Sequence, residues 1–169
     1  IQISACSDCW HRPEHSLRQV SNDIFASEGL LEDPYKVELL KLEYNVEPYC
    51  NAKCIMCGPW FSSTWAQEQH QFDGEPPPRP MREFKHNNSL RDVELSSLKK
   101  IYFNGGEPLL TREHITVLER VPDLSKVDVT YNTNGSIFPD IDVLRIWEKA
   151  KSITVNVSID ATEKQFEYI

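Results

Sequence analysis

Three cysteines stand close together in the sequence, Cys50, Cys54 and Cys57, with the spacing C-x3-C-x2-C. Cysteine thiolates are the usual ligands of iron–sulfur clusters, and a cubane [4Fe–4S] cluster normally takes four of them. Three thiolates from one loop would leave one iron without a protein ligand, and an open metal position can bind a small molecule, as in catalytic zinc sites. The triplet therefore predicts a [4Fe–4S] cluster that binds a small ligand.

A second cysteine pair, Cys6 and Cys9, has the spacing C-x2-C. Together with Cys54 and Cys57 it would supply the four thiolates of a structural zinc site. The two pairs lie much further apart, however, than the roughly 15–20 residues that separate the pairs of a zinc ribbon. A zinc-stabilised binding module, and an iron–sulfur electron-transfer module with a fourth protein ligand, stay open as alternatives.

Further candidate ligand residues stand where predicted strands end. The run Gly105-Gly106-Glu107-Pro108 combines glycines, which allow the backbone to approach a cofactor closely, with carbonyl and carboxylate oxygens that accept hydrogen bonds from an ammonium group. Ribose hydroxyls or a carboxylate could be held by the polar residues that follow two later strands, Asn132, Asn134, Ser158 and Asp160. Turn formation alone would also explain these residue types.

These residues are positioned by strands and helices that alternate along the chain. We expect strands at residues 37–46, 100–104, 127–131 and 153–159. We expect helices over about residues 15–28, after Gly58-Pro59, through Leu95 and Leu98, from a Thr111 cap to about Val121, and after an Asp140 cap. Such alternation is typical of a parallel sheet built from right-handed βαβ units, which binds ligands at the carboxyl ends of its strands. The sequence predicts an α/β fold, a partial (β/α) barrel of four βα units behind a short N-terminal helical extension.

The composition of the 169 residues, 40% hydrophobic and 26% charged, is that of an ordinary globular domain. A net charge of −8 disfavours binding to the nucleic acid backbone. No apolar run approaches the roughly 20 residues that span a bilayer, and no signal peptide opens the chain, so we expect a cytoplasmic protein without membrane partners. The five cysteines are odd in number and clustered, unlike a secreted disulfide framework. The histidines, including His114, are expected at the surface.

The cysteine loop after the first strand and the Gly-Gly-Glu-Pro turn after the second together resemble the radical SAM superfamily. The chain is most similar to radical SAM proteins that contain a twitch domain. The similar stretches cover nearly the whole chain: residues 6–18, 49–65, 101–110, 131–135 and 155–161. Two features differ from the superfamily pattern. Met56 stands where an aromatic residue is frequent, and only four strands are predicted where the core commonly has six.

The resemblance implies that Cys50, Cys54 and Cys57 bind a [4Fe–4S] cluster, whose open iron binds the amino and carboxylate groups of S-adenosylmethionine. It implies that the turn at residues 105–107 holds the methionine amino group and that Ser158 and Asp160 lie near the ribose. An external one-electron donor would then reduce the cluster. Cleavage of the cofactor would give a 5′-deoxyadenosyl radical that abstracts hydrogen from a peptide or small-molecule substrate.

The resemblance also implies how the chain is organised. Residues 1–35 would form an N-terminal extension, the tail of a SPASM- or twitch-like segment in which Cys6 and Cys9 bind a second iron–sulfur cluster. Residues 36–169 would form the radical SAM core, truncated after its fourth strand. The sequence begins at Ile1 without Met, so we expect it to be an internal part of a longer enzyme and to be inactive in isolation.

Overall fold

The computed structural model describes residues 17–30, 38–74, 90 and 92–159, and the chain divides into two compact units, residues 1–38 and 39–169. The first unit contains helix α2 (Leu17–Ser27), where a helix was predicted, followed by Gly29 in a left-handed conformation. In this helix Val20 and Ile24 are exposed, whereas Phe25 is buried. Among the described residues, no helix is both long and apolar enough to cross a membrane.

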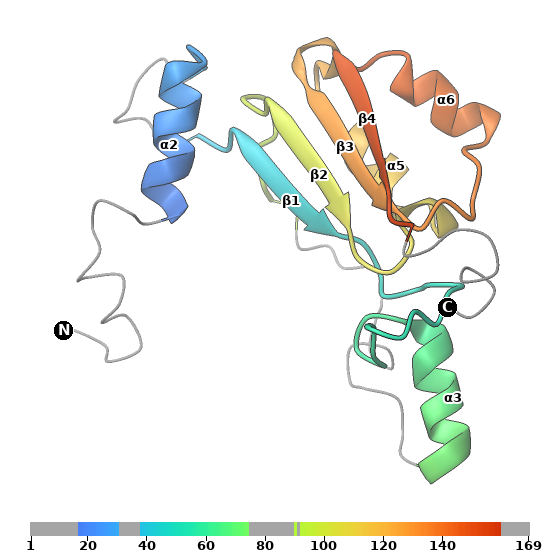
Figure 1. Cartoon of the computed structure of the whole chain (residues 1–169). Helices are drawn as coiled ribbons and strands as arrows, with labels where there is room; N and C mark the ends of the chain where they lie inside the picture. Colours follow the sequence, from blue (N-terminus) through green and yellow to red (C-terminus); the bar gives the residue numbers. More distant parts are fainter. Residues whose placement is uncertain (1–16, 31–37, 75–89, 91, 160–169) are drawn as a thin grey trace, which may run out of the picture. The chain divides into compact units, whose positions relative to one another are not determined.

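The second unit contains a parallel sheet with strand order β1-β2-β3-β4 (Figure 1). The strands are β1 (Lys41–Asn45), β2 (Lys100–Asn104), β3 (Asp128–Thr133) and β4 (Ser152–Val157). Each strand pairs with the next one along the chain, in parallel, so the chain crosses over between every pair. The predicted α/β fold, four parallel strands that alternate with helical segments as in a partial radical SAM barrel, is confirmed.

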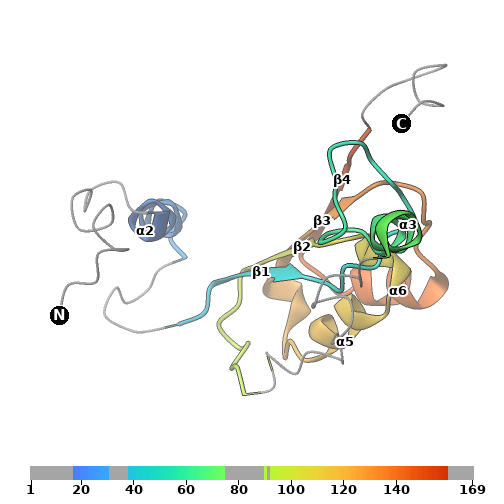
Figure 2. The ribbon, with the colours of Figure 1, turned by 90° about the horizontal axis from the view of Figure 1, so that it is seen from below.

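Helices α5 (Glu113–Glu119) and α6 (Ile141–Trp147) lie on the same face of this sheet (Figures 1 and 2). The core forms between them and the strands: Phe103 stacks on Tyr131 with ring centroids 4.9 Å apart, and Tyr131 contacts Trp147 of α6 at 5.0 Å. Three further helical segments lie in the connections, α3 (Ser63–Asp73), η4 (Pro108–Leu110) and η5 (Leu124–Lys126). No described helix of the second unit covers the opposite face, which we call the inner face.

The start of helix α3 was predicted wrongly. The carbonyl of Gly58 accepts the N–H groups of Phe61 and Ser62, which closes a turn after Gly58-Pro59 instead of opening a helix. Helix α3 begins only at Ser63, and Ser62 is its cap, because its hydroxyl accepts the N–H of Trp65 at 3.4 Å. The cysteine loop is therefore longer than expected and reaches the first turn of α3.

Two other helix predictions are also wrong. Helix α5 has no side-chain cap, since Thr111 ends η4 and its buried hydroxyl has no partner among the described residues. The chain around Leu95 and Leu98 forms turns, although both leucines are buried in the core. The cap predicted for α6 is confirmed: the side chain of Asp140 accepts the N–H of Val143 at 2.9 Å.

His114 lies in the core, so its predicted surface position is wrong. Its side chain is 1% exposed, and Nδ1 lies 2.8 Å from the hydroxyl of Tyr131. Burial, with the nearby positive charge of Arg112, lowers the pKa of His114 to about 4, while Asp140 acts in the opposite direction. The imidazole is therefore neutral near pH 7 and joins α5 to the sheet through a hydrogen bond.

Candidate functional site

The cysteine loop follows β1 directly and runs through irregular backbone to α3. Among the described residues these three cysteines form no disulfide: Cys50 is buried, Cys54 is half-buried and Cys57 is exposed. The N–H of Cys57 donates to the carbonyl of Cys54 at 2.9 Å, which closes a turn containing the last two cysteines. The loop thus presents one thiol from the protein interior and two from its surface.

The first residues of α3 fix the main chain of the cysteine loop. The hydroxyl of Ser63 accepts the N–H of Cys50 at 3.1 Å and lies 3.2 Å from the Cys50 carbonyl oxygen, to which it can donate. The carbonyls of Ala52 and Cys54 accept further hydrogen bonds, from Ser62, Thr64 and Trp65. A curved loop held at three of its carbonyls is suited to carrying thiolates at defined positions. In the sequence, the signal for this support is the polar run Ser62-Ser63-Thr64 at the start of α3.

The arrangement of the three thiols can be compared with the requirements of a single metal ion and of an iron–sulfur cluster. Among the described residues, no three histidine, cysteine or carboxylate side chains converge on the position of a single metal ion. A zinc ion needs all of its ligands within about 2.0–2.3 Å of one point. In a [4Fe–4S] cluster each cysteine binds a different iron, so its cysteines need not converge in this way. Three cysteines on one supported loop are thus compatible with a cluster.

The Gly-Gly turn after β2 packs directly against the chain that leads into the cysteine loop. The N–H of Glu107 donates to the carbonyl of Tyr49 at 2.7 Å. A Cβ atom on Gly106 would lie 2.3 Å from that carbonyl oxygen, and one on Gly105, whose φ is 122°, would lie 2.6 Å from the carbonyl oxygen of Val46. Glycine is thus needed at both positions because the turn lies against the main chain of Val46 and Tyr49. The sequence alone had suggested only that glycine would allow a cofactor to approach.

Glu107 joins the turn after β2 to the end of β3. Its side chain is fully buried. Oε1 accepts hydrogen bonds from the Leu109 N–H at 3.1 Å and the Thr133 hydroxyl at 2.7 Å, and Oε2 accepts one from the Asn134 N–H at 2.8 Å. A carboxylate offers about four lone-pair sites, so most of its capacity is already used. Pro108, the first residue of η4, is buried beside it.

Asn134 contacts the cysteine loop. Its side-chain amide donates to Sγ of Cys50 at 3.7 Å and to Oδ1 of Asn51 at 3.1 Å. The main-chain N–H of Ala52 also donates to Sγ of Cys50, at 3.4 Å. Beyond Asn134, the hydroxyl of Ser136 accepts a hydrogen bond from the Asn51 amide at 2.8 Å. The segment after β3 therefore forms a second wall of the loop.

The other predicted site residues lie in different surroundings. Strand β3 continues beyond its predicted end, so Asn132 lies within the strand and bonds to Asn104 and Asn156 on the neighbouring strands. The N–H of Ser158 donates to the Thr133 carbonyl at 2.8 Å, which places Ser158 beside the end of β3. Three predicted residues lie outside the described residues: Asp160, Cys6 and Cys9.

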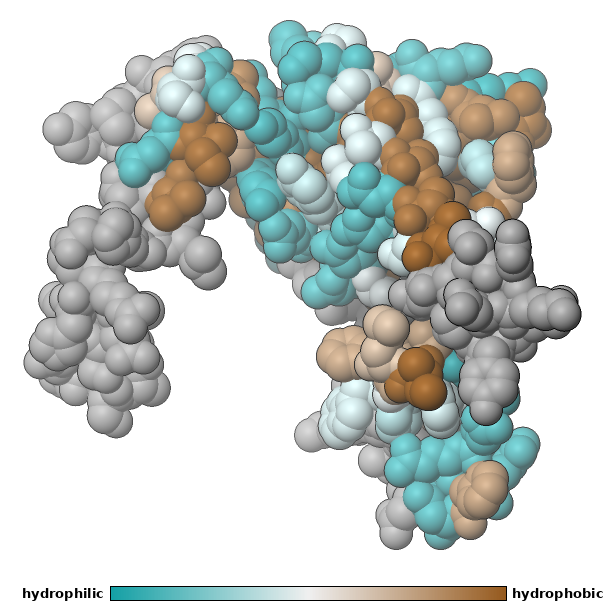
Figure 3. All heavy atoms as spheres, viewed as in Figure 1, coloured by the Kyte–Doolittle hydropathy of each residue, from teal (hydrophilic) through white to brown (hydrophobic). Residues whose placement is uncertain are grey.

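A cavity of about 280 Å³ lies beside the Gly-Gly turn. It is lined by the rings of Trp60 and Phe61, by Gly105 and Gly106, and by the end of β1 at Asn45. Apolar side chains gather on the surface here, at the loop that precedes α3 (Figure 3). The cavity thus combines an apolar side with the main chain of the predicted cofactor-binding turn.

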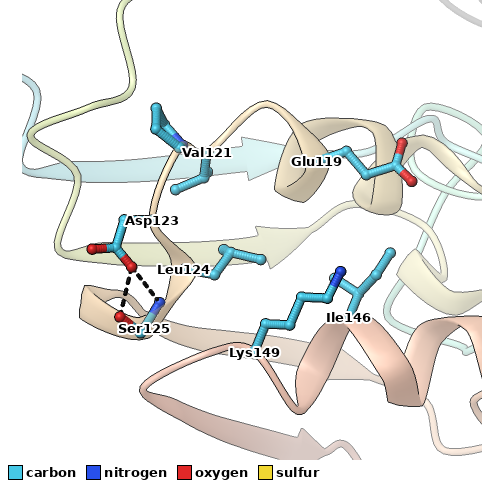
Figure 4. A pocket seen from close by; sticks show the side chains of 8 residues that line it. Glu119, Val121, Asp123, Leu124, Ser125, Ile146 and Lys149 are labelled. Atoms are coloured by element: carbon cyan, nitrogen blue, oxygen red, sulfur yellow. Dashed lines mark hydrogen bonds between the residues drawn. The ribbon is translucent and has the colours of Figure 1, made fainter.

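A second cavity, of about 400 Å³, contains none of the predicted site residues. It is lined by residues that follow α5 and by the end of α6, including Glu119 and Lys149 (Figure 4). At its edge Asp123 accepts two hydrogen bonds from Ser125, from the N–H at 3.2 Å and from the hydroxyl at 2.6 Å. These residues precede β3 and β4, so the cavity lies away from the carboxyl ends of the strands.

Comparison with known families gives a clear match. The sequence profile of the Radical SAM superfamily matches residues 44–168, which include the cysteine loop, the Gly-Gly turn and all four strand ends. The chain belongs to the radical SAM superfamily. Membership implies a [4Fe–4S] cluster and S-adenosylmethionine as cofactors, which agrees with the cofactors expected from the sequence.

Several curated proteins are similar to this radical SAM chain. The GTP 3′,8-cyclase of Mannheimia succiniciproducens is 26% identical over 141 residues, covering 80% of this chain and 38% of the relative. The probable GTP 3′,8-cyclase of Methanothermobacter marburgensis is 27% identical over 136 residues, covering 80% and 40%. The chain therefore spans about two-fifths of the length of these relatives. No solved structure gives a significant match.

Proposed function

We propose that this chain is the cofactor-binding part of a radical SAM enzyme in which Cys50, Cys54 and Cys57 hold a [4Fe–4S] cluster. The observation that carries the proposal is the hydrogen bond from Glu107 N–H to the Tyr49 carbonyl at 2.7 Å, just before Cys50. This contact joins the loop after β1 to the turn after β2, so a ligand on the open iron would lie beside the turn. The family match supplies the nature of both cofactors.

When bound, the reduced cluster and S-adenosylmethionine supply a 5′-deoxyadenosyl radical, formed as one electron breaks the sulfur–C5′ bond, which takes a hydrogen atom from the substrate. The protein holds and orients the reactants. Among the described residues, no main-chain N–H donates to the carbonyls of Gly105 or Gly106, so these oxygens are suited to accepting hydrogen bonds from the methionine amino group. The cavity beside them offers the apolar rings of Trp60 and Phe61 for water exclusion.

The remaining predicted contacts complete the cofactor site in this proposal. Pro108 ends the turn, and Glu107 is proposed to support it, since its buried carboxylate bonds to Leu109, Thr133 and Asn134. Asn134, Ser158 and Asp160 are proposed to reach the ribose or the carboxylate, since they follow β3 and β4. Cys6 and Cys9 are proposed to bind a second iron–sulfur cluster with ligands from elsewhere in the full-length protein.

The substrate and the electron donor are proposed from chemistry and from the relatives. The exposed position of Cys57 gives an external one-electron donor access to the cluster. A peptide or another small molecule is the first candidate substrate. The relatives named GTP 3′,8-cyclase make a guanine nucleotide a second candidate.

The proposal is tested by anaerobic reconstitution of the full-length protein with iron and sulfide, followed by electron paramagnetic resonance with and without S-adenosylmethionine. We expect the cofactor to change the spectrum of the reduced cluster and reduction to yield 5′-deoxyadenosine. A spectrum that the cofactor leaves unchanged would favour an electron-transfer module, and tight binding of zinc alone would favour a structural zinc module.

Two substitutions in the loop test whether Cys54 is a cluster ligand. Cys54→Ala is expected to lose the [4Fe–4S] signal, since only two thiolates of the triplet remain. Met56→Leu, a neighbouring exposed change of similar volume, should keep it. Retention of a full cubane by Cys54→Ala would overturn the ligand assignment.

A further inference from the structure

Four asparagines, one from each strand, form a continuous row across the sheet. Asn45 pairs in register with Asn104, and Asn132 pairs with Asn156. The amide of Asn132 donates to Oδ1 of Asn104, which joins the two pairs. The amide of Asn156 donates to Oδ1 of Asn132 at 2.9 Å. We call these four residues the asparagine row.

The row lies on the inner face of the sheet. Side chains alternate between the two faces of a strand, and the neighbouring residues Tyr44, Phe103 and Tyr131 are buried on the side of α5 and α6. Asn45 and Asn156 are exposed, and Asn104 and Asn132 are half-buried. Asparagine is depleted in strands, so four of them in register are not explained by a preference for forming a sheet.

The hydrogen bonds within the row leave part of its capacity unused. Each carboxamide has two N–H donors and an oxygen with two lone pairs. Among the described residues, nothing pairs with the side-chain N–H₂ of Asn104 or with Oδ1 of Asn156. The row therefore offers donors at β2 and an acceptor at β4, two strands or roughly 10 Å apart. Hydrogen bonds in a chain polarise one another, which strengthens both ends as binding groups.

The charged groups of the inner face, among them Lys100, lie closer to the start of the strands than the row does, and most of them are paired. Lys41 pairs with Glu43 at 2.6 Å and lies over the ring of Tyr102, 4.7 Å from its centroid. Asp128 pairs with Lys151 at 2.8 Å. The row itself carries no charge, so its surface favours a neutral ligand group that both donates and accepts hydrogen bonds.

The row also adjoins the candidate cofactor site. Asn104 immediately precedes Gly105, and Asn45 lines the cavity beside the Gly-Gly turn. Asn132 is two residues from Asn134, whose amide contacts the Cys50 sulfur. A group held on the row would therefore lie beside the place where the radical is proposed to form.

We propose that the asparagine row binds a neutral amide of the substrate, either the backbone amide of a peptide or the lactam of a nucleobase. This inference rests on the proposed function and extends it to the class of substrate group that the protein recognises. It assigns Asn132 to the substrate instead of to the cofactor, which revises the assignment made from the sequence.

The test measures binding to the reconstituted full-length protein by calorimetry in the presence of S-adenosylmethionine. The probes are a blocked peptide, N-acetylglycine N-methylamide, the nucleoside guanosine, and inorganic triphosphate. We expect one of the two neutral probes to bind, and its identity tells which source of the amide applies. Asn132→Leu and the more exposed Asn156→Leu should each weaken this binding about tenfold, whereas Thr154→Val, on the same face but outside the row, should leave it within about twofold.

The outcomes distinguish the two proposals. If the cofactor leaves the cluster spectrum of the parent protein unchanged, the proposed function fails. If the spectrum changes but neither neutral probe binds, or only triphosphate binds, the inference about the row fails alone. The same holds if Asn156→Leu, whose folding is checked by its melting temperature, binds the probe as the parent does or weakens only the cofactor.

Discussion

The side-chain amide of Asn134 and the sulfur of Cys50 form a hydrogen bond of 3.7 Å between residues that are 84 positions apart in the chain. The same sulfur accepts the Ala52 N–H at 3.4 Å. Hydrogen bonds to cysteine sulfur stabilise the more negative, reduced form of an iron–sulfur cluster and raise its potential. If Cys50 is a cluster ligand, as proposed, the contact connects the segment after β3 to the redox properties of the cluster.

Replacing Asn134 by leucine should make the cluster harder to reduce. The loss of one hydrogen bond of about 1 kcal/mol corresponds to a decrease of roughly 40 mV in the one-electron potential. Redox titration of the reconstituted full-length protein, followed by electron paramagnetic resonance, measures this change. Thr154→Val is the control, and equal potentials for Asn134→Leu and the parent would show that the amide does not reach the cluster ligand.

Replacing Gly106 by alanine should disrupt the junction between the turn and the cysteine loop. The new Cβ would lie 2.3 Å from the Tyr49 carbonyl oxygen, which real structures do not tolerate, so one of the two segments must move. We expect a loss of about 1–3 kcal/mol in the free energy of unfolding and poor cluster incorporation. Gly58→Ala is the matched control, because its Cβ would meet nothing within 4 Å. A Gly106→Ala protein as stable as this control would disprove the close approach.

Replacing Glu107 by glutamine should destabilise the protein before any cofactor binds. The buried carboxylate accepts hydrogen bonds from three donors, including the Thr133 hydroxyl and the Asn134 N–H. An amide group presents an N–H₂ to one of these donors, which costs about 1–3 kcal/mol. Urea unfolding of the protein without cluster measures this loss. The exposed change Glu119→Gln should have little effect, and an equal effect of both would contradict the buried network.

His114 should make the protein less stable as the pH falls through a defined range. Burial holds its pKa at about 4 in the folded protein, below the ordinary value of 6.5. Between these values the unfolded chain binds a proton that the folded chain does not, so stability decreases as pH falls from 6.5 toward 4, by at most about 3 kcal/mol. Urea midpoints at pH 7 and 4.5 show this decrease. His114→Leu should reduce it, and an unchanged decrease in that variant would assign the effect to other groups.

The strands followed from the sequence because their signals are local. Alternating apolar residues and the glycine and proline residues after them mark residues 100–104 as a strand and end it correctly. The same local reasoning failed at Thr111, a residue type suited to capping, because the chain enters a 3-10 turn before α5. It failed at His114 as well, because a hydrogen bond to Tyr131 compensates for burial of the imidazole.

The spacing of residues in the sequence identified the candidate ligands. It did not identify the residues that hold those ligands in place. The triplet and the Gly-Gly turn carry short signals that a single sequence shows. The contacts of Glu107 with Thr133 and of Asn134 with Cys50 join residues 26 and 84 positions apart, and no local pattern encodes such pairs. The asparagine row was missed for a related reason, since strand register is needed to see that its members are neighbours.

The dependence of the cysteine loop on later segments has a consequence for how the protein matures. The three cysteines are synthesised early, but the contacts that shape their loop come from the Gly-Gly turn and from Asn134 and Ser136. A growing chain that has emerged only as far as α3 carries every ligand of the triplet and few of the surfaces that arrange them. Loading of iron and sulfide should therefore wait until translation has passed the end of β3.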